Sequence, residues 1–311
     1  MPAWRHRARC VSEPLFAGLS AFPLTPMRED GVDEEAFVGI VKRLAAVGVD
    51  SIGALGSTGS YAYLSRAERA RVARFAVEHA AGVPVIVGVG ALRTSQVLAL
   101  VDDAEAAGAA GLLLPAMSYQ PLTDDDVLGL FRAVTEHTGL PVIVYDNPGT
   151  THTTLSLDLY ARLAQLPGIV SFKIPGVPCD PAGARQRVAQ IRSVLPGHVT
   201  VGVSGDSCAA AGLNAGCETW YSVVGGMLPK VTLAIVRAAQ AGRGDAAQAL
   251  ADRLAPLWKL FEDHGSLRVV AAVAERLGFA PDGCLPLPLR GLTADERERV
   301  TAVVARLGLA G

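Results

Sequence analysis

The sequence predicts an α/β protein: a (β/α)8 barrel, or TIM barrel, with a C-terminal helical extension. Short apolar runs alternate with amphipathic stretches along most of the chain, and eight strand–helix units can be counted. The strand segments are apolar almost throughout, as a parallel sheet buried on both faces requires. Eight units favour a closed barrel over a doubly wound open sheet. The open alternative is weakened further because no Gly-x-Gly-x-x-Gly follows the first strand.

Capping residues mark several helix boundaries. Asp33 is a candidate N-cap for the first helix, and Gly48 ends that helix. Ser65 and Glu68 have the spacing of a capping box at the start of the second. Strands are expected at residues 16–21, 50–55, 83–89, 110–114, 140–145, 169–173, 199–203 and 219–224. The helices between them are expected at residues 33–47, 65–81, 94–107, 123–138, 156–166, 181–195 and 206–215, and the eighth begins near residue 229.

The chain is predicted to divide into three parts. Residues 1–13 form a basic tail, residues 14–230 form the barrel and residues 231–311 form the helical extension. After Pro229 no further strand pattern appears. The extension is expected to contain helices at residues 231–240, 246–261, 267–277 and 293–307, with the Pro-rich segment LPLPLRG before the last.

Composition excludes several classes of function. With 28 Lys and Arg against 30 Asp and Glu, the net charge is −2, so there is no general basic field for nucleic acid or an anionic membrane. No apolar run is long enough for a membrane span, and the basic N-terminus is not followed by the apolar core of a secretory signal. We therefore expect a cytoplasmic protein.

The cysteines and the potential metal ligands are scattered. Five cysteines occur with no Cys-x-x-Cys pair, which favours reduced thiols over a disulfide framework or a zinc site. No group of His, Asp and Glu has the spacing of a metal site, so neither a metal nor another cofactor is expected. The cysteines are Cys10, Cys179, Cys208, Cys217 and Cys284.

Lys173 is the most informative residue for function. Function in a barrel is found at the carboxyl ends of the strands, and Lys173 ends the sixth expected strand. A buried amine has a depressed pKa because burial disfavours the ammonium form, and a neutral amine can attack a ketone to form an imine. The alternative is a structural lysine that reaches solvent or pairs with a carboxylate.

Other polar residues stand at neighbouring strand ends. Tyr145 ends the fifth strand, close enough for its phenol to move protons near Lys173, although a structural rim aromatic fits the same pattern. The turn at residues 56–60, Gly-Ser-Thr-Gly-Ser, offers amides and hydroxyls for a carboxylate or phosphate, or is simply a tight turn. His152 is a weaker candidate for the mouth of the barrel, because a lone loop histidine is usually solvated.

These motifs together resemble the dihydrodipicolinate synthase / N-acetylneuraminate lyase family of class I aldolases. The resemblance runs from Phe16 to Leu307 and rests on the order of its motifs along the chain. They are Phe22-Pro23-Leu24-Thr25-Pro26, the turn at 56–60, Tyr145 with Asn147-Pro148, Lys173, and Ser204-Gly205-Asp206.

The resemblance implies roles for individual residues. Lys173 forms the Schiff base with pyruvate or a similar 2-oxo acid, and Tyr145 is the general acid/base with the Ser57 hydroxyl in its proton relay. The amides of Ser57 and Thr58 bind the substrate carboxylate. Synthases of the family end this relay in a tyrosine from a neighbouring subunit, for which Tyr119 is the nearest candidate, with Met117 as the alternative occupant. Gly205 and Tyr221 complete the expected substrate site.

The sequence also departs from the family pattern. No arginine follows the Tyr145-Asp146-Asn147-Pro148 segment, so the usual clamp for the second substrate's carboxylate is missing. Ser60 replaces the usual glutamate, Ile174 follows Lys173 where a glutamate is common, and bulky Trp220-Tyr221 replaces a small aliphatic residue. These changes favour a different aldol partner, or a sugar-acid aldolase or dehydratase.

Three functions remain open at this point. They are a Schiff-base lyase for a small 2-oxo acid and possibly an aldehyde, an authentic 4-hydroxy-tetrahydrodipicolinate synthase, and a non-catalytic 2-oxo-acid sensor. The resemblance also implies a homotetramer or a homodimer.

Overall fold

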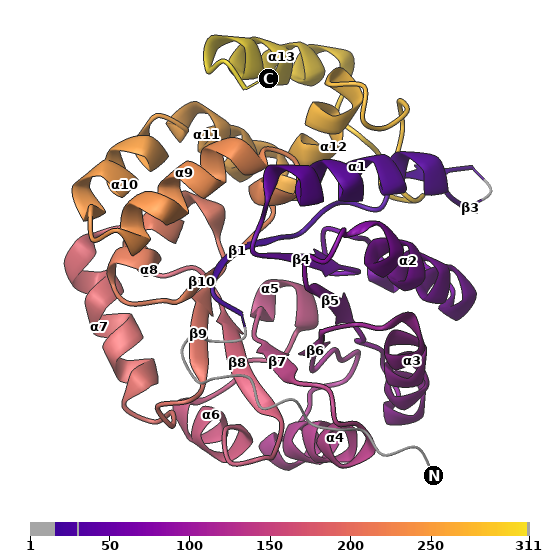
Figure 1. Cartoon of the computed structure of the whole chain (residues 1–311), viewed down its shortest axis with the longest axis vertical. Coiled ribbons are helices and arrows are strands. Elements are labelled where there is room, and N and C mark those ends of the chain that lie inside the picture. The colour runs from indigo at the N-terminus through magenta and orange to yellow at the C-terminus, as the bar shows by residue number, and fades with distance from the viewer. Residues whose placement is uncertain (1–15, 30, 310–311) are drawn as a thin grey trace.

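The computed structural model describes residues 16–29 and 31–309, so the predicted tail at 1–13 and Cys10 lie outside the described residues. Within them, eight parallel strands close into a barrel, and Figure 1 shows the ring of helices around it. The predicted TIM barrel is therefore confirmed, and the doubly wound alternative is wrong.

The barrel runs in sequence order. Its strands are β1 (Gly18–Ala21), β4 (Ser51–Ala54), β5 (Val85–Gly88), β6 (Gly111–Pro115), β7 (Val142–Tyr145), β8 (Ile169–Ile174), β9 (Thr200–Val203) and β10 (Thr219–Ser222). The intervening helices are α1 (Glu34–Val47), α2 (Arg66–His79), α3 (Thr94–Ala107), α4 (Asp124–His137), α5 (Pro148–Thr151), α6 (Leu157–Leu163), α7 (Pro181–Arg192) and α8 (Ala209–Asn214). Single 3-10 turns are η1 (Tyr61–Tyr63), η2 (Asp206–Cys208) and η3 (Val224–Gly226).

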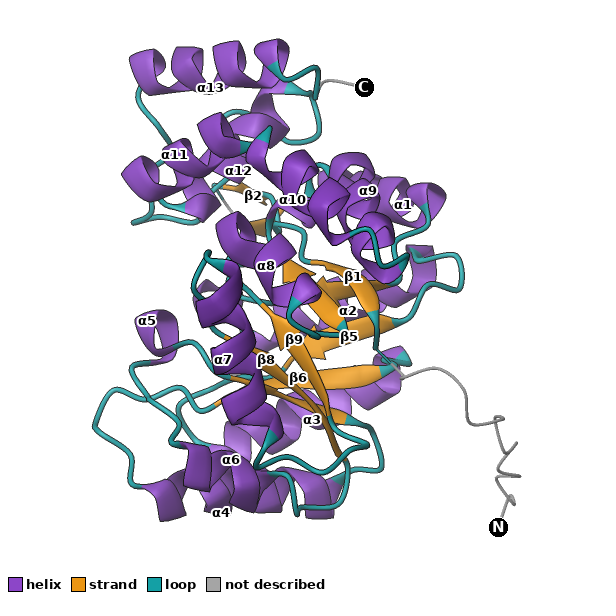
Figure 2. Ribbon diagram, turned by 90° about the vertical axis from the view of Figure 1, so that its left-hand side faces the viewer, coloured by secondary structure: helices purple, strands orange, loops and turns teal. Residues whose placement is uncertain are grey.

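The chain continues with helices after the last barrel strand. They are α9 (Pro229–Gln240), α10 (Gly244–Asp252), α11 (Ala255–His264), α12 (Ser266–Arg276) and α13 (Ala294–Arg306). Figure 2 shows α11, α12 and α13 gathered at one end of the molecule, opposite α4 and α6. Figure 1 shows that α9 and α10 complete the ring around the barrel, whereas α12 and α13 lie outside this ring, next to α1.

Large aromatic rings fill the barrel against strand glycines. A Cβ on Gly53 would lie only 2.4 Å from the ring of Phe22, so this ring fills the space that a side chain would need. The ring of Tyr221 fills the corresponding space beside Gly202. The inner cluster is separate from the apolar layer between strands and helices. Its members are Phe16, Phe22, Ile86, Leu113, Ile143, Tyr145 and Tyr221. The interior is therefore solid below the site.

The local predictions hold in part. Asp33 caps the start of α1 and Gly48 caps its end, and the Ser65–Glu68 capping box begins α2, all as expected. The single helix predicted at 246–261 is wrong, because the structure has two helices, α10 and α11. In one continuous helix Pro256 would have no N–H to donate, and its ring would clash with the carbonyl four residues back. This favours a break before Pro256, which lies in the first turn of α11. The short hairpin of β2 (Met27–Arg28) and β3 (Gly31–Val32) was not predicted.

Among the described residues, no helix has both the length and the apolar character that crossing a membrane requires.

Candidate active site

Lys173 lies at the carboxyl end of β8, beside Tyr145 of β7. The two residues are register partners across the parallel strands, and both are buried. The amine Nζ lies 3.8 Å from the centre of the Phe22 ring and 4.5 Å from that of Tyr145. Burial lowers the pKa of the Lys173 amine, and the opposing effect of negative charge on Tyr145 and Asp206 is smaller. Burial therefore makes the neutral amine more accessible than it is in a solvent-exposed lysine.

The Tyr145 hydroxyl is the centre of a small hydrogen-bond network. It lies 3.1 Å from Ser57 Oγ and accepts a 2.9 Å hydrogen bond from Asn147 Nδ2. Burial raises the pKa of Tyr145. When Lys173 carries a positive charge, that charge and the hydrogen bonds with Ser57, Asn147 and Thr150 outweigh burial, so the pKa falls below its ordinary value. The phenol is thus set to exchange its proton more readily than a free tyrosine.

The turn at residues 56–60 presents backbone amides to the same space. Leu55 and Ser60 both have left-handed backbone angles, with φ of 57° and 54°, which non-glycine residues rarely adopt. The turn fits because Gly88 has no side chain: a Cβ there would lie 1.9 Å from the Leu55 carbonyl oxygen. Among the described residues, the Ser57 and Thr58 amides donate no backbone hydrogen bond. Their N–H groups are thus available to an anion.

These groups line one cavity of about 670 Å³. The sequence candidates that it brings together are Ser57, Thr58, Tyr145, Lys173, Gly205 and Tyr221. Tyr221 contributes its ring, since its hydroxyl lies 2.8 Å from Ser171 Oγ. Tyr119 is 87% exposed and does not line this cavity in its own chain, whereas Met117 does. His152 is exposed and also lies outside the lining.

The structure adds residues that the sequence analysis did not single out. Tyr61 of η1 and Asn147 enter the lining, and Trp258 of α11 and Ser266 of α12 come from the helical extension. Asn147 stood inside a quoted motif and was identifiable there. The residues of α11 and α12 carry no local signal, because only the packing of the extension brings them to the barrel mouth.

Asp206 holds the loop after β9 in place. Its carboxylate accepts hydrogen bonds from Trp220 Nε1 at 2.9 Å, from Ser222 Oγ at 3.0 Å and from the Val224 amide at 2.9 Å. Neighbouring Gly205 has φ +81°, and a Cβ there would lie 2.9 Å from Gly176 Cα, so this close approach of two loops requires glycine. The cavity wall at this point is therefore rigidly built.

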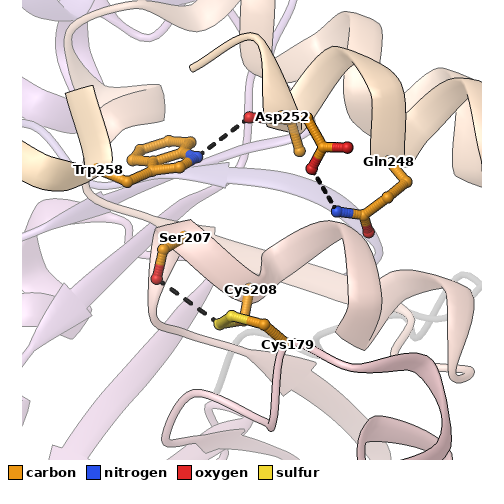
Figure 3. The surroundings of a disulfide bond; sticks show 7 residues. Cys179, Ser207, Cys208, Gln248, Asp252 and Trp258 are labelled. Atoms are coloured by element: carbon orange, nitrogen blue, oxygen red, sulfur yellow. Dashed lines mark hydrogen bonds between the residues drawn. A yellow bond between two sulfur atoms is a disulfide. The ribbon is translucent and has the colours of Figure 1, made fainter. Parts of the chain in front are cut away.

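A disulfide ties the same two loops together. Cys179 follows β8 and Cys208 ends η2, and their Cα atoms lie 4.7 Å apart (Figure 3). The expectation of reduced thiols is therefore wrong for this pair. Adjacent parallel strands bring the two loops side by side, which their separation of 29 residues in the sequence does not reveal. Cys217 and Cys284 are buried thiols.

We expect reduction of the Cys179–Cys208 bond to lower the free energy of unfolding by about 3.6 kcal/mol, because the link closes a loop of 29 residues in the unfolded chain. Guanidinium unfolding with and without reductant measures the difference. The variant Cys179→Ser should show the same loss and no response to reductant. Coincident unfolding curves for the variant and the unreduced wild type would contradict this expectation.

Comparison with known proteins agrees with this geometry. The model of the dihydrodipicolinate synthetase family matches residues 15–307. The chain belongs to this family. It is accordingly a lyase of the aldolase type, as the sequence motifs predicted.

Relatives of the family cover nearly the whole chain. The 4-hydroxy-tetrahydrodipicolinate synthase of Methylococcus capsulatus is 33% identical over 288 residues, which make up 92% of this chain and 96% of the relative. The crystal structure of dihydrodipicolinate synthase from Agrobacterium tumefaciens strain C58 is 44% identical, with a TM-score of 0.90 over 94% of this chain and 98% of its own. Dihydrodipicolinate synthase from Acinetobacter baumannii, solved with pyruvate, is 27% identical, with a TM-score of 0.85 over 95% and 99%.

Proposed function

We propose that this protein is a Schiff-base aldolase in which Lys173 condenses with the 2-oxo carbon of pyruvate or another small 2-oxo acid. The observation that carries the proposal is that Lys173, only 4% exposed, lies on the wall of a large cavity. The salt bridges among the described residues do not include Lys173, so no carboxylate holds it as an ammonium ion.

The reaction follows from this chemistry. The amine adds to the carbonyl carbon, water leaves, and the resulting protonated imine draws electrons from the neighbouring carbon. Tyr145 removes or returns the proton there, with Ser57 relaying it, and the bond between the third and fourth carbons forms or breaks. The amides of Ser57 and Thr58 hold the substrate carboxylate, and Gly205 and Tyr221 form the wall around it.

The second substrate is inferred from the outer part of the cavity. Within the described residues, Lys173 is the sole cationic side chain in the lining, and Glu262 of α11 places a carboxylate near the mouth. A substrate with its own distal carboxylate, such as aspartate semialdehyde, therefore lacks a cation to pair with. This favours an uncharged aldehyde as the aldol partner, or the cleavage or dehydration of a sugar acid.

An authentic 4-hydroxy-tetrahydrodipicolinate synthase is the second candidate, and it is favoured by the names of the relatives. We infer a homodimer or homotetramer from the family, which mass photometry tests. Tyr119 then remains a candidate residue for the neighbouring subunit's site.

Borohydride trapping tests the proposal directly. We expect pyruvate, among a panel of 2-oxo acids, to leave a reduced adduct on Lys173 that peptide mass spectrometry locates. Coupled turnover of pyruvate with aspartate semialdehyde then separates the two candidates, since the proposed aldolase should be inactive with this pair. No adduct with any 2-oxo acid would rule out both enzymes.

A further inference from the structure

Tyr61 is a buried phenol in the cavity that the proposed reaction does not use. It stands in η1, directly after the turn at residues 56–60, and it is 6% exposed. Its hydroxyl donates to Met117 Sδ at 3.4 Å. A thioether sulfur is a weak acceptor, so a good donor faces the cavity with only a poor partner.

The position of the Tyr61 ring is fixed from behind. The guanidinium of Arg69 lies 5.2 Å from the ring centre, and it is buried, donating 2.9 Å hydrogen bonds to the Gly88 and Gly90 carbonyl oxygens. A Cβ on Gly90 would lie 3.1 Å from Tyr61 Cε2, so the ring packs against a bare backbone. The Tyr61 side chain, which contacts the Arg69 guanidinium and packs against the backbone at Gly90, is therefore oriented before any ligand binds.

The two phenols of the cavity differ in their proton chemistry. Burial, and next the charge of Tyr145, raise the pKa of Tyr61 to about 12, against a smaller opposing effect of Arg69. The pKa of Tyr145 is lowered instead, chiefly by Lys173 acting against burial. Tyr145 is therefore suited to exchanging protons, whereas Tyr61 stays protonated at neutral pH and keeps an O–H that can donate a hydrogen bond.

We propose that Tyr61 determines specificity by donating a hydrogen bond to an oxygen on the fourth carbon of a substrate bound to Lys173 as an imine. This rests on the proposed function. Tyr61 lines the same cavity as Lys173 and Tyr145. The fourth carbon is two bonds beyond the imine carbon, so it extends from Lys173 into this cavity. An aldol carries its hydroxyl on that carbon, so the preferred substrate class is the 4-hydroxy-2-oxo acids.

A pair of matched probes tests this without knowledge of the natural substrate. Borohydride trapping is titrated with 2-oxobutanoate and with 4-hydroxy-2-oxobutanoate, which differ by one hydroxyl group. In the wild type we expect half-maximal trapping at about fivefold lower concentration of the hydroxylated probe, the effect of one added hydrogen bond. In Tyr61→Phe the two concentrations should become equal, while 2-oxobutanoate is trapped as in the wild type.

Every other outcome counts against the assignment. A wild type without preference, or a preference that survives in Tyr61→Phe, means that the phenol does not bind this oxygen. Loss of trapping of both probes in the variant means that Tyr61 supports the imine pocket as a whole. If Tyr119→Phe removes the preference and Tyr61→Phe does not, the donor belongs to the other tyrosine. Absence of trapping in the wild type is a separate result, which rejects the proposed function itself.

Discussion

Replacing Lys173 with Met is expected to abolish borohydride-trapped adducts and to lower turnover by at least ~10³-fold, because no other amine lines the cavity within the described residues. The same change should stabilise the fold by about 1 kcal/mol, or roughly 2 °C in Tm. Methionine is nearly as long as lysine and apolar, so it removes the cost of burying an amine without leaving a hole. Trapping with mass spectrometry and calorimetry measure the two effects.

The stability gain should depend on pH. The folded pKa of Lys173 is depressed below its ordinary 10.5, so the unfolded chain binds this proton first as the pH falls. The wild type therefore loses stability relative to Lys173→Met between pH 10.5 and the folded pKa, and the difference is constant below it. Imine formation in the wild type should rise with pH through that lower pKa. A variant that still traps pyruvate, or is less stable at every pH, would contradict the assignment.

The placement of Lys173 and Tyr145 at neighbouring strand ends was predictable from the sequence because barrel geometry is regular. Parallel strands place their carboxyl ends at one face, so Lys173 and Tyr145 had to be neighbours once the strands were located, and the register partnership follows. Gly88, which admits the turn at 56–60, shows the limit: its neighbour is Leu55, more than thirty residues earlier, and no local pattern predicts that contact.

Contacts between distant segments were not predictable. Trp258 lines the cavity only because α11 packs on the barrel. A sequence pattern predicts the helix but not the surface against which it packs. The Cys179–Cys208 bond has the same origin, since cysteine spacing cannot show which loops become adjacent. Tyr61 directly follows the turn at residues 56–60, yet the orientation of its ring depends on Arg69 and on the space left by Gly90. The residues that we propose to determine specificity thus reach the cavity through tertiary contacts that no local pattern predicts.

The second large effect is expected for Tyr145→Phe, which should slow proton exchange at the third carbon of pyruvate by about 10²–10³-fold. The phenol is the proposed proton-exchanging group beside Lys173 and forms hydrogen bonds with Ser57 and Asn147. Phenylalanine keeps the ring and removes only the oxygen. Nuclear magnetic resonance in D₂O follows the exchange of the methyl protons and requires no second substrate.

Binding should change much less than chemistry in this variant. In the proposed site the amides of Ser57 and Thr58 hold the carboxylate, and Tyr145→Phe leaves these amides in place. The pyruvate concentration for half-maximal trapping should therefore stay within about threefold of the wild-type value. Ser57→Ala provides the graded comparison. It removes one relay hydroxyl but keeps the backbone amide and the phenol, and so should slow exchange by only about tenfold. Exchange at the wild-type rate in Tyr145→Phe would assign the proton to another group. An effect of Ser57→Ala equal to that of Tyr145→Phe would instead make the pair, rather than the phenol, the unit that moves the proton.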